Sequence, residues 1–212
     1  MATLDHVVVA ARTLDEGTAY VQRVLGVPLS PGGQHPKMGT HNRLLNLGGG
    51  VYLEVIAIDP EGADPGRPRW FGLDSPRLQA ELRQSPRLIH WVARTDDIHG
   101  AVAKLPELGR VHRASRGHLE WEITIPDDGE PLEGGLIPTL IAWGHTPHPT
   151  AQLADVGCRL VGLRGFHPEP GRVAKRLGKL GLEGALELVQ SGAAGLEAEI
   201  LTGARRVTLG RG

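Results

Sequence analysis

Apolar residues run in short β-branched stretches that predict strands, and between some of these stretches they recur at helical spacing. Residues 5–11, DHVVVAA, predict a strand, and Thr13 with Glu16 forms a capping box at a helix start. The next apolar residues have the i, i+3, i+4 spacing of a packed helix: Tyr20, Val21, Val24 and Leu25. Gly26 ends that helix, and a loop with a short strand leads to strands at 41–47 and 51–58. The first unit is therefore β, α, a loop with a short strand, β, β.

The same pattern occurs twice. LDHVVVAARTLDEG at 4–17 matches LIHWVARTDDIHG at 88–100, and GVYLEVIA at 50–57 matches GLIPTLIA at 135–142. The offsets are 84 residues (from 6 to 90) and 85 residues (from 50 to 135), so a single insertion or deletion accounts for the difference. A nearly constant offset across two kinds of strand indicates a duplicated βαβββ module.

The remaining segments complete the predicted organisation. The second unit has a strand at 88–94, a helix with Ile98, Val102 and Leu105 on one face, strands near 110–114 and 118–126, and a last strand at 136–143. Residues 158–212 repeat the order of elements without the early histidine, so this third unit is expected to widen the sheet or to form an interface. The predicted division is therefore 1–60 (first module), 61–87 (linker with a short helix from Ser75–Pro76), 88–144 (second module), 145–157 (linker) and 158–212 (third, module-like extension).

The composition of the chain excludes several classes of function. The charges nearly cancel, at 23 basic against 24 acidic residues, which gives no electrostatic basis for binding nucleic acid or an anionic membrane. Cys158 is the only cysteine, so a disulfide framework and a multi-cysteine metal site are excluded, and Cys158 is expected to be a small buried apolar residue. No apolar run is long enough to span a bilayer, and the first residues do not resemble a signal peptide. We therefore expect a cytoplasmic protein.

Two histidines at equivalent positions of the duplicated strands are the strongest candidates for chemistry. Side chains alternate along a strand, so His6 is expected to share a face with Val8, and His90 with Leu88 and Val92. If the two modules pack with pseudo-twofold symmetry, their first and last strands converge on one concave surface. This places Glu54, which shares its face with Tyr52 and Ile56, near both histidines. Two imidazoles and one carboxylate suit zinc, iron, nickel, cobalt or manganese.

The position equivalent to Glu54 in the second module is Thr139. A carboxylate in the apolar run VYLEVIAI is costly to bury unless it is paired, protonated or metal-bound, so an arginine partner for Glu54 is the alternative to a metal. Nearby, His41 could act as an acid or base and Asn42 could hydrogen-bond a ligand. Trp143 shares the face of Thr139 and could form an aromatic wall. We interpret His145 and His148, beside prolines in GHTPHPT, as part of a solvated loop.

These residues support a resemblance to a known superfamily. The repeated βαβββ pattern, LDHVVVA with His6 and YLEVIA with Glu54 resemble the vicinal oxygen chelate proteins, which include glyoxalase I, type I extradiol dioxygenases and resistance proteins that bind antibiotics. Residues 35–60 with RWFGLD at 69–74 are similar to glyoxalase-like domain proteins. The resemblance implies an α+β fold of curved mixed sheets around a cup-shaped site. It also implies that the ligand positions of glyoxalase I map onto His6, Glu54, His90 and Thr139.

Threonine cannot replace the carboxylate that a glyoxalase uses for proton transfer, so the resemblance does not imply that reaction. Extradiol dioxygenases use two histidines and a glutamate, but their glutamate lies on the last strand of the second module. Three hypotheses remain. The first is a metal-dependent lyase, isomerase or dioxygenase in which His6, Glu54 and His90 hold the ion and a small substrate chelates it through neighbouring oxygens. The second is a metal-independent protein that binds small molecules. The third is a structural homodimer with a decayed site.

Overall fold

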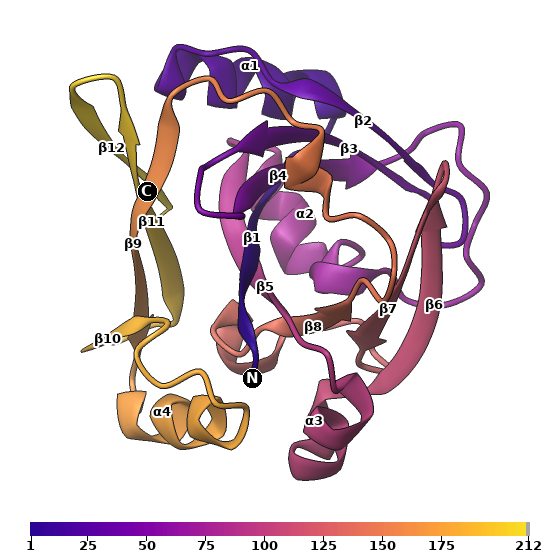
Figure 1. The fold of residues 1–212 in the computed structure, drawn as a ribbon, viewed down its shortest axis with the longest axis vertical. Coiled ribbons are helices and arrows are strands. Elements are labelled where there is room, and N and C mark those ends of the chain that lie inside the picture. Colours follow the sequence, from indigo (N-terminus) through magenta and orange to yellow (C-terminus); the bar gives the residue numbers. More distant parts are fainter. Residues whose placement is uncertain (211–212) are drawn as a thin grey trace.

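Two β-sheets organise the chain in this computed structural model, which describes residues 1–210 (Figure 1). The larger sheet has eight strands in the order β2 (Ser30–His35), β3 (Thr40–Asn46), β4 (Tyr52–Ile58), β1 (Thr3–Ala10), β5 (Arg87–Arg94), β8 (Thr139–Ala142), β7 (Leu119–Ile125) and β6 (Arg110–Arg116). The smaller has four, in the order β10 (Glu187–Gln190), β9 (Cys158–His167), β11 (Gly195–Thr202) and β12 (Arg205–Gly210). The predicted end of the third unit at 212 lies outside the described residues.

Helices connect these strands. The α-helices are α1 (Leu14–Leu25), α2 (Pro76–Leu82), α3 (Ile98–Lys104) and α4 (Pro170–Lys179), and short 3₁₀ helices cover Trp70–Gly72, Pro106–Leu108, Leu132–Gly135 and Pro149–Ala151. Helix α1 begins and ends where the sequence predicts. The Thr13 hydroxyl accepts from the Glu16 N–H at 3.2 Å, and Gly26 takes the left-handed conformation at the other end.

The strand order of the larger sheet shows the duplication directly. Strands β2-β3-β4-β1 are followed by β5-β8-β7-β6, so the two modules meet at the antiparallel pair of β1 and β5. In each module the first strand pairs in parallel with the last, β1 with β4 and β5 with β8. This confirms the predicted α+β fold of repeated βαβββ modules that form a curved mixed sheet around a cup.

The concave face of the larger sheet is packed by the segment that joins the modules. A buried apolar cluster combines Val8 of β1, Ile56 of β4 and Val92 of β5 with side chains from the joining segment: Trp70, Phe71, Leu73, Leu78 and Leu82. Figure 1 shows α2 lying on this side of the curled sheet. The joining segment is therefore a structural part of the cup.

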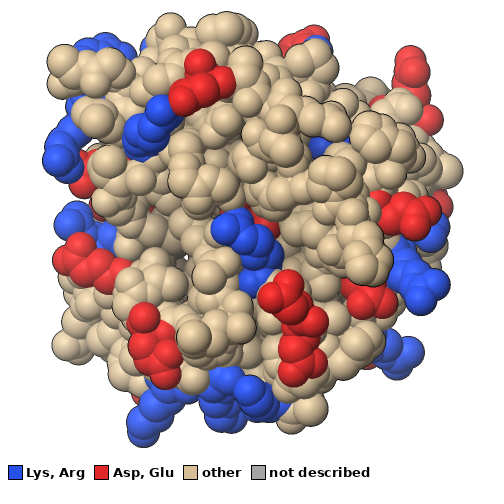
Figure 2. Space-filling view, in the orientation of Figure 1, with Lys and Arg blue, Asp and Glu red and all other residues tan. Residues whose placement is uncertain are grey.

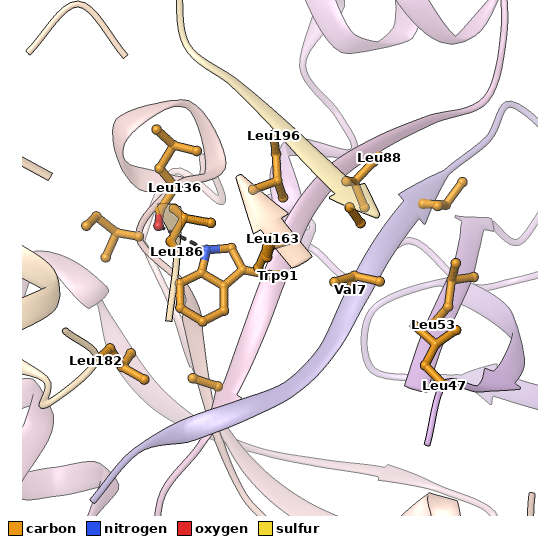
Figure 3. Packing of buried hydrophobic residues seen from close by; sticks show 14 of the residues in the cluster. Val7, Leu47, Leu53, Leu88, Trp91, Leu136, Leu163, Leu182, Leu186 and Leu196 are labelled. Atoms are coloured by element: carbon orange, nitrogen blue, oxygen red, sulfur yellow. Dashed lines mark hydrogen bonds between the residues drawn. The ribbon is translucent and has the colours of Figure 1, made fainter. Parts of the chain in front are cut away.

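The opposite face of β1 and β5 is covered by the C-terminal sheet. Trp91 of β5 is fully buried there with Leu163 of β9 and Leu196 of β11, and its indole N–H donates to the Leu136 carbonyl at 3.0 Å (Figure 3). The burial of these apolar side chains is the main contribution to the stability of the interface between the two sheets. Of the two roles expected for the third unit, it has the interface, because its strands form a separate sheet. Cys158 is free and buried in this layer, as predicted.

Two β-bulges change which side chains share a face. Asp5 is the extra residue on β1, because Leu4 and His6 on either side of it pair with consecutive residues of β5. Ile89 is the extra residue on β5, because the consecutive residues Val8 and Val9 pair with His90 and Leu88. The bulge at Ile89 puts Leu88 in the outer cluster, so the prediction that His90 shares its face with Leu88 is wrong, whereas the prediction for Val92 holds.

Strand β8 is shorter than predicted. Residues 132–135 form a 3₁₀ turn in which Glu133, Gly134 and Gly135 have positive φ, and Pro138 has no N–H to pair. The buried Glu133 carboxylate also holds the third unit: it accepts from Arg172 at 2.8 Å and Arg176 at 2.6 Å, and lies 3.1 Å from His167 Nε2.

Charges of both signs are interspersed on the face of the molecule in Figure 2. No helix within residues 1–210 combines the length and apolar character needed to cross a bilayer.

Candidate functional site

A small cavity lies on the concave side of the larger sheet. It is lined by aromatic residues, a group of polar residues and two isoleucines: Trp70, Phe71, Trp121, Trp143, Tyr52, His6, His35, Asn42, Glu54, Arg116, Ile123 and Ile141. Its volume, traced by the centre of a water-sized sphere, is about 20 Å³, which is room for a water molecule. We call this cavity and its lining the cup. The aromatic rings that enter from the joining segment leave little open space in it.

His6 lies at the base of the cup between two carboxylates. Its Nδ1–H donates to Asp5 Oδ1 at 2.6 Å, and its Nε2 is 3.5 Å from Glu54 Oε2. The ring stacks on Tyr52 with centroids 4.4 Å apart. All four side chains are buried. His6 is thus held in one orientation by the bulge residue Asp5 on one side and the β4 residue Glu54 on the other.

These contacts set the charges of the three groups. Burial alone would lower the pKa of His6, but hydrogen bonds to Asp5 and Glu54 outweigh it and raise the pKa to about 9. Burial alone would raise the pKa of Glu54, but His6 and Asn42 lower it to about 2. The pKa of Asp5 is likewise well below its usual range, because hydrogen bonds from His148 and His6 outweigh burial. At neutral pH the cup therefore contains an imidazolium between two carboxylates.

Asn42 links Glu54 to the opposite wall of the cup. Its Nδ2–H donates to Glu54 Oε1 at 2.6 Å, and its Oδ1 accepts from Arg116 Nη1 at 2.9 Å and from the Gly33 N–H at 3.0 Å. The buried partner of Glu54 is thus His6 with Asn42. The arginine that the sequence suggested as an alternative partner is present as Arg116, but it reaches Asn42 and not Glu54. Asn42 is positioned to orient Glu54.

His35 is a neutral member of the same wall. Its Nδ1 lies 3.0 Å from the Thr40 hydroxyl, and its Nε2 lies 3.4 Å from Asn42 Nδ2. Burial lowers its pKa to about 4. Trp70 and Trp121 approach it edge-on, with ring centroids 5.1 Å and 6.0 Å away. His35 therefore adds an uncharged ring to the aromatic lining.

His90, the equivalent of His6 in the second module, has a different environment. Its Nε2 accepts the Thr139 N–H at 3.0 Å and lies 3.0 Å from the Thr139 hydroxyl, while its Nδ1–H donates to the Gly135 carbonyl at 3.2 Å. Burial lowers its pKa to about 3, so the ring is neutral. His90 and Thr139 line a neighbouring cavity that shares Trp70 and Phe71 with the cup. His90 and Thr139 therefore lie next to the cup but do not line it.

The remaining predicted residues divide between the cup and its surroundings. Trp143 lines the cup, and its indole N–H donates to Asp5 Oδ2 at 3.0 Å. His41 does not line it: this partly exposed ring has Nδ1 4.0 Å from Asp59 Oδ1. His148 is not the solvated residue that the sequence suggested, because its Nε2–H donates to Asp5 Oδ2 at 2.9 Å. The interpretation is wrong for His148, because the loop folds back onto β1 there, whereas His145 is exposed as expected.

Sequence reasoning missed several cup residues. Asp5 adjoins His6 in the chain and would face the other side of a regular strand, so only the bulge explains its contact with His6. Trp70 comes from a segment that is rich in proline and glycine, and Trp121 lies in a predicted strand, where a tryptophan ordinarily packs in the core. Arg116 closes a β-hairpin, where an arginine is usually solvated. The signal that could have identified Trp121 is alternation, since Trp121 and Ile123 share one face of β7.

The side chains do not fit a metal centre with three protein ligands. Within residues 1–210, no group of three or more His, Cys, Asp or Glu side chains is arranged to hold a metal ion. His6 and Glu54 offer one nitrogen and one oxygen 3.5 Å apart, but both ring nitrogens of His90 are engaged by Gly135 and Thr139. A third protein ligand is therefore lacking at the cup.

Paired βαβββ modules with a cup between them define the class of glyoxalase-like folds. The sequence matches the glyoxalase-like domain family over residues 4–181, which is most of the chain. The protein therefore belongs to the glyoxalase-like domain family, and the resemblance noted in the sequence is confirmed. No curated protein matches the sequence.

Solved structures with a similar fold include a hypothetical protein from Staphylococcus aureus. It is 16% identical with a TM-score of 0.59, and the match covers 99% of this chain and 85% of that one. Methylmalonyl-CoA epimerase from Mycobacterium tuberculosis is 20% identical with a TM-score of 0.42, over 67% of this chain and 88% of that one. A Streptomyces coelicolor methylmalonyl-CoA epimerase variant in complex with 2-nitronate-propionyl-CoA is 17% identical with a TM-score of 0.44, over 70% and 100%. At these identities the likeness concerns the fold alone.

Proposed function

We propose that this protein binds a small, planar, oxygen-bearing molecule in the cup, and that side chains rather than a metal centre with three protein ligands hold it. The single observation that carries the proposal is the composition of the cup. Four aromatic side chains, Trp70, Phe71, Trp121 and Trp143, surround a small group of fixed polar residues. Apolar walls with a few oriented polar groups are typical of small-molecule sites. His6 and Glu54 serve as fixed charges in that site.

Entry of a ligand requires the rings from the joining segment to move, because the present space accommodates only a water molecule. Phe71 lines the cup, the neighbouring cavity and a larger cleft beside α2. Its backbone has φ 60°, which is unfavourable for an aromatic residue. We therefore expect ligands to pass or displace Phe71.

The alternative is a metal-dependent lyase, isomerase or dioxygenase that uses His6, Glu54 and His90. The observation that favours it is the pairing of an imidazole nitrogen with a carboxylate oxygen in the cup of a glyoxalase-like fold. In that case the substrate would bind through the ion. The two functions differ in their dependence on metal and in the role of His90.

A comparison of catechol with guaiacol distinguishes metal-independent binding from the metal-dependent enzyme. Catechol chelates metals through two neighbouring oxygens, whereas guaiacol, its monomethyl ether, chelates poorly. Three of the 4 tryptophans line the cup, so their fluorescence reports binding there. Both compounds are titrated into chelator-treated protein and into protein supplemented with zinc, iron or manganese. We expect both to bind saturably, with dissociation constants that agree within about twofold with and without metal; a twofold change is below 1 kcal/mol.

The matched variants are His90→Ala and Phe71→Ala, each checked for folding by thermal melting. His90→Ala should retain catechol binding, since His90 does not line the cup, and Phe71→Ala should bind catechol more tightly because it opens the cup. Binding that requires metal, together with about one ion per chain that His90→Ala loses, would overturn the proposal in favour of the metal-dependent enzyme.

A further inference from the structure

Two tryptophans that line the cup have indole N–H donors without a partner among residues 1–210. The indole nitrogens of Trp70 and Trp121 are buried and make no hydrogen bond to any described residue, and these side chains are 3% and 8% exposed. A buried donor without an acceptor destabilises the folded protein, because it has given up its hydrogen bonds to water. Native proteins rarely leave such groups without a role. Both rings belong to the same wall, since each meets His35 edge-on.

Arg116 adds a positive charge to the same cavity. Within the described residues its guanidinium makes one hydrogen bond, from Nη1 to Asn42 Oδ1 at 2.9 Å, and forms no ion pair with a carboxylate. A guanidinium has five N–H donors, so most of those on Arg116 remain available. Arg116 is partly buried and lines the cup with both tryptophans.

The other polar groups of the cup are already engaged. Glu54 accepts from Asn42 and contacts His6, and the Trp143 N–H donates to Asp5. His6 carries one positive charge between the carboxylates of Asp5 and Glu54. Arg94 supplies a second positive charge, with its Nη1 3.8 Å from Asp5 Oδ2, so an anion in the cup does not meet an uncompensated carboxylate. What the cup lacks is an acceptor for the two indole N–H groups and a negative charge opposite Arg116.

We infer that the molecule bound in the cup carries a carboxylate, and that the indole N–H groups of Trp70 and Trp121 and the guanidinium of Arg116 bind its oxygens. A carboxylate supplies two acceptor oxygens and one negative charge, which matches what these three side chains leave open. The aromatic walls accommodate a planar apolar body. The substrate class is therefore a small aromatic or conjugated carboxylate. This inference rests on the proposed function, because it assigns the ligand of the same site.

Benzoate and benzamide test the inference by isothermal titration calorimetry, since they have nearly the same shape but only benzoate is charged. We expect wild-type protein to bind benzoate at least about tenfold more tightly than benzamide. Trp70→Phe and Trp121→Phe keep an aromatic ring and remove the N–H, and each should weaken benzoate binding about tenfold, the lower end for a hydrogen bond to a charged group. Arg116→Gln should bring the two affinities close together.

Arg113→Gln is the matched control for Arg116→Gln. Arg113 lies on the same strand β6, but its side chain is exposed and does not line the cup, so benzoate affinity should change less than about threefold. Arg116 is partly exposed, and its substitution keeps the test decisive if either of the Trp70 and Trp121 variants fails to fold. Equal binding of benzoate and benzamide, or a preference unchanged in Arg116→Gln, overturns the carboxylate assignment while catechol binding still supports the proposed function. If benzoate, benzamide and catechol all fail to bind, the proposed function itself is refuted.

Discussion

Replacing Glu54 by glutamine should change the protonation state of His6. Glutamine keeps an oxygen that can accept from Asn42 Nδ2, now 2.6 Å from Glu54 Oε1, but it places an NH₂ group where Glu54 Oε2 lies 3.5 Å from His6 Nε2. A protonated His6 would then direct N–H against N–H. A neutral His6 avoids this conflict, because it can keep its Nδ1–H on Asp5 and accept from glutamine at Nε2. Glu54→Gln therefore drives His6 to the neutral form.

The size of the effect follows from the pKa of about 9 that His6 has in the wild-type protein. For the neutral form to dominate at pH 7, the pKa of His6 must fall by at least about two units, which corresponds to about 3 kcal/mol. Loss of one partner of a buried ion pair typically costs about 3–5 kcal/mol. The lost interaction with Glu54 is therefore large enough to lower the pKa of His6 by two units. The free energy of unfolding at pH 7 should fall by about 2–3 kcal/mol in Glu54→Gln.

Histidine-selective ¹³C NMR between pH 5 and pH 10 measures this prediction, and the His6 signal among the 10 histidines is assigned by its absence in His6→Gln. Wild-type His6 should titrate near pH 9, and in Glu54→Gln it should titrate below pH 7 or not at all. Glu16→Gln, a surface change beside Arg12, is the control and should leave the His6 signal unchanged. The reasoning fails if wild-type His6 titrates near 6.5, or if His6 in Glu54→Gln is still mostly protonated at pH 7.

Three further predictions concern stability. Trp91→Leu should lower the free energy of unfolding in urea by about 3–4 kcal/mol, because it leaves a cavity in the outer core and an unpaired Leu136 carbonyl; a loss below 1 kcal/mol would contradict the burial of Trp91. Glu133→Gln should cost about 2 kcal/mol and increase proteolysis of the third unit, and unchanged proteolysis would count against the docking role of Glu133. His35 and His90 have pKa values lowered to about 4 and about 3, so the unfolded chain binds more protons below pH 6.5. The two rings together should lower the free energy of unfolding by about 3 kcal/mol from pH 6.5 to pH 5, and a flat profile would refute the neutral, buried state of both rings.

Much of the fold could be predicted because its signals are local or repeated. The capping box at Thr13, the left-handed Gly26 and the short helix after Ser75 each depend on a few neighbouring residues, and each lies where the sequence indicates. The duplication adds long-range information, since equivalent strands must take equivalent places in a pseudo-symmetric sheet. Within the site, the proximity of His6, Asn42 and Glu54 follows from strand alternation in β1, β3 and β4.

The parts that could not be predicted depend on irregular backbone or on contacts between distant segments. A bulge adds a residue without altering the apolar pattern, so neither Asp5 beside His6 nor the separation of Leu88 from His90 was visible in the sequence. The contact of His148 with Asp5 joins residues 143 positions apart. The filling of the cup by Trp70 depends on how the joining segment folds back over the sheet, which its proline-rich composition does not specify.

The two histidines at equivalent positions show how one substitution divides a duplicated site. His6 meets a carboxylate on the last strand of its module and is protonated, with a pKa of about 9. His90 meets Thr139 at the equivalent position and is neutral, with a pKa of about 3. Both rings are buried, so burial alone would leave both neutral, and the neighbours decide the difference. The first module therefore supplies the imidazolium and the carboxylate that line the cup, while the second module supplies aromatic and apolar walls and the Arg116 guanidinium.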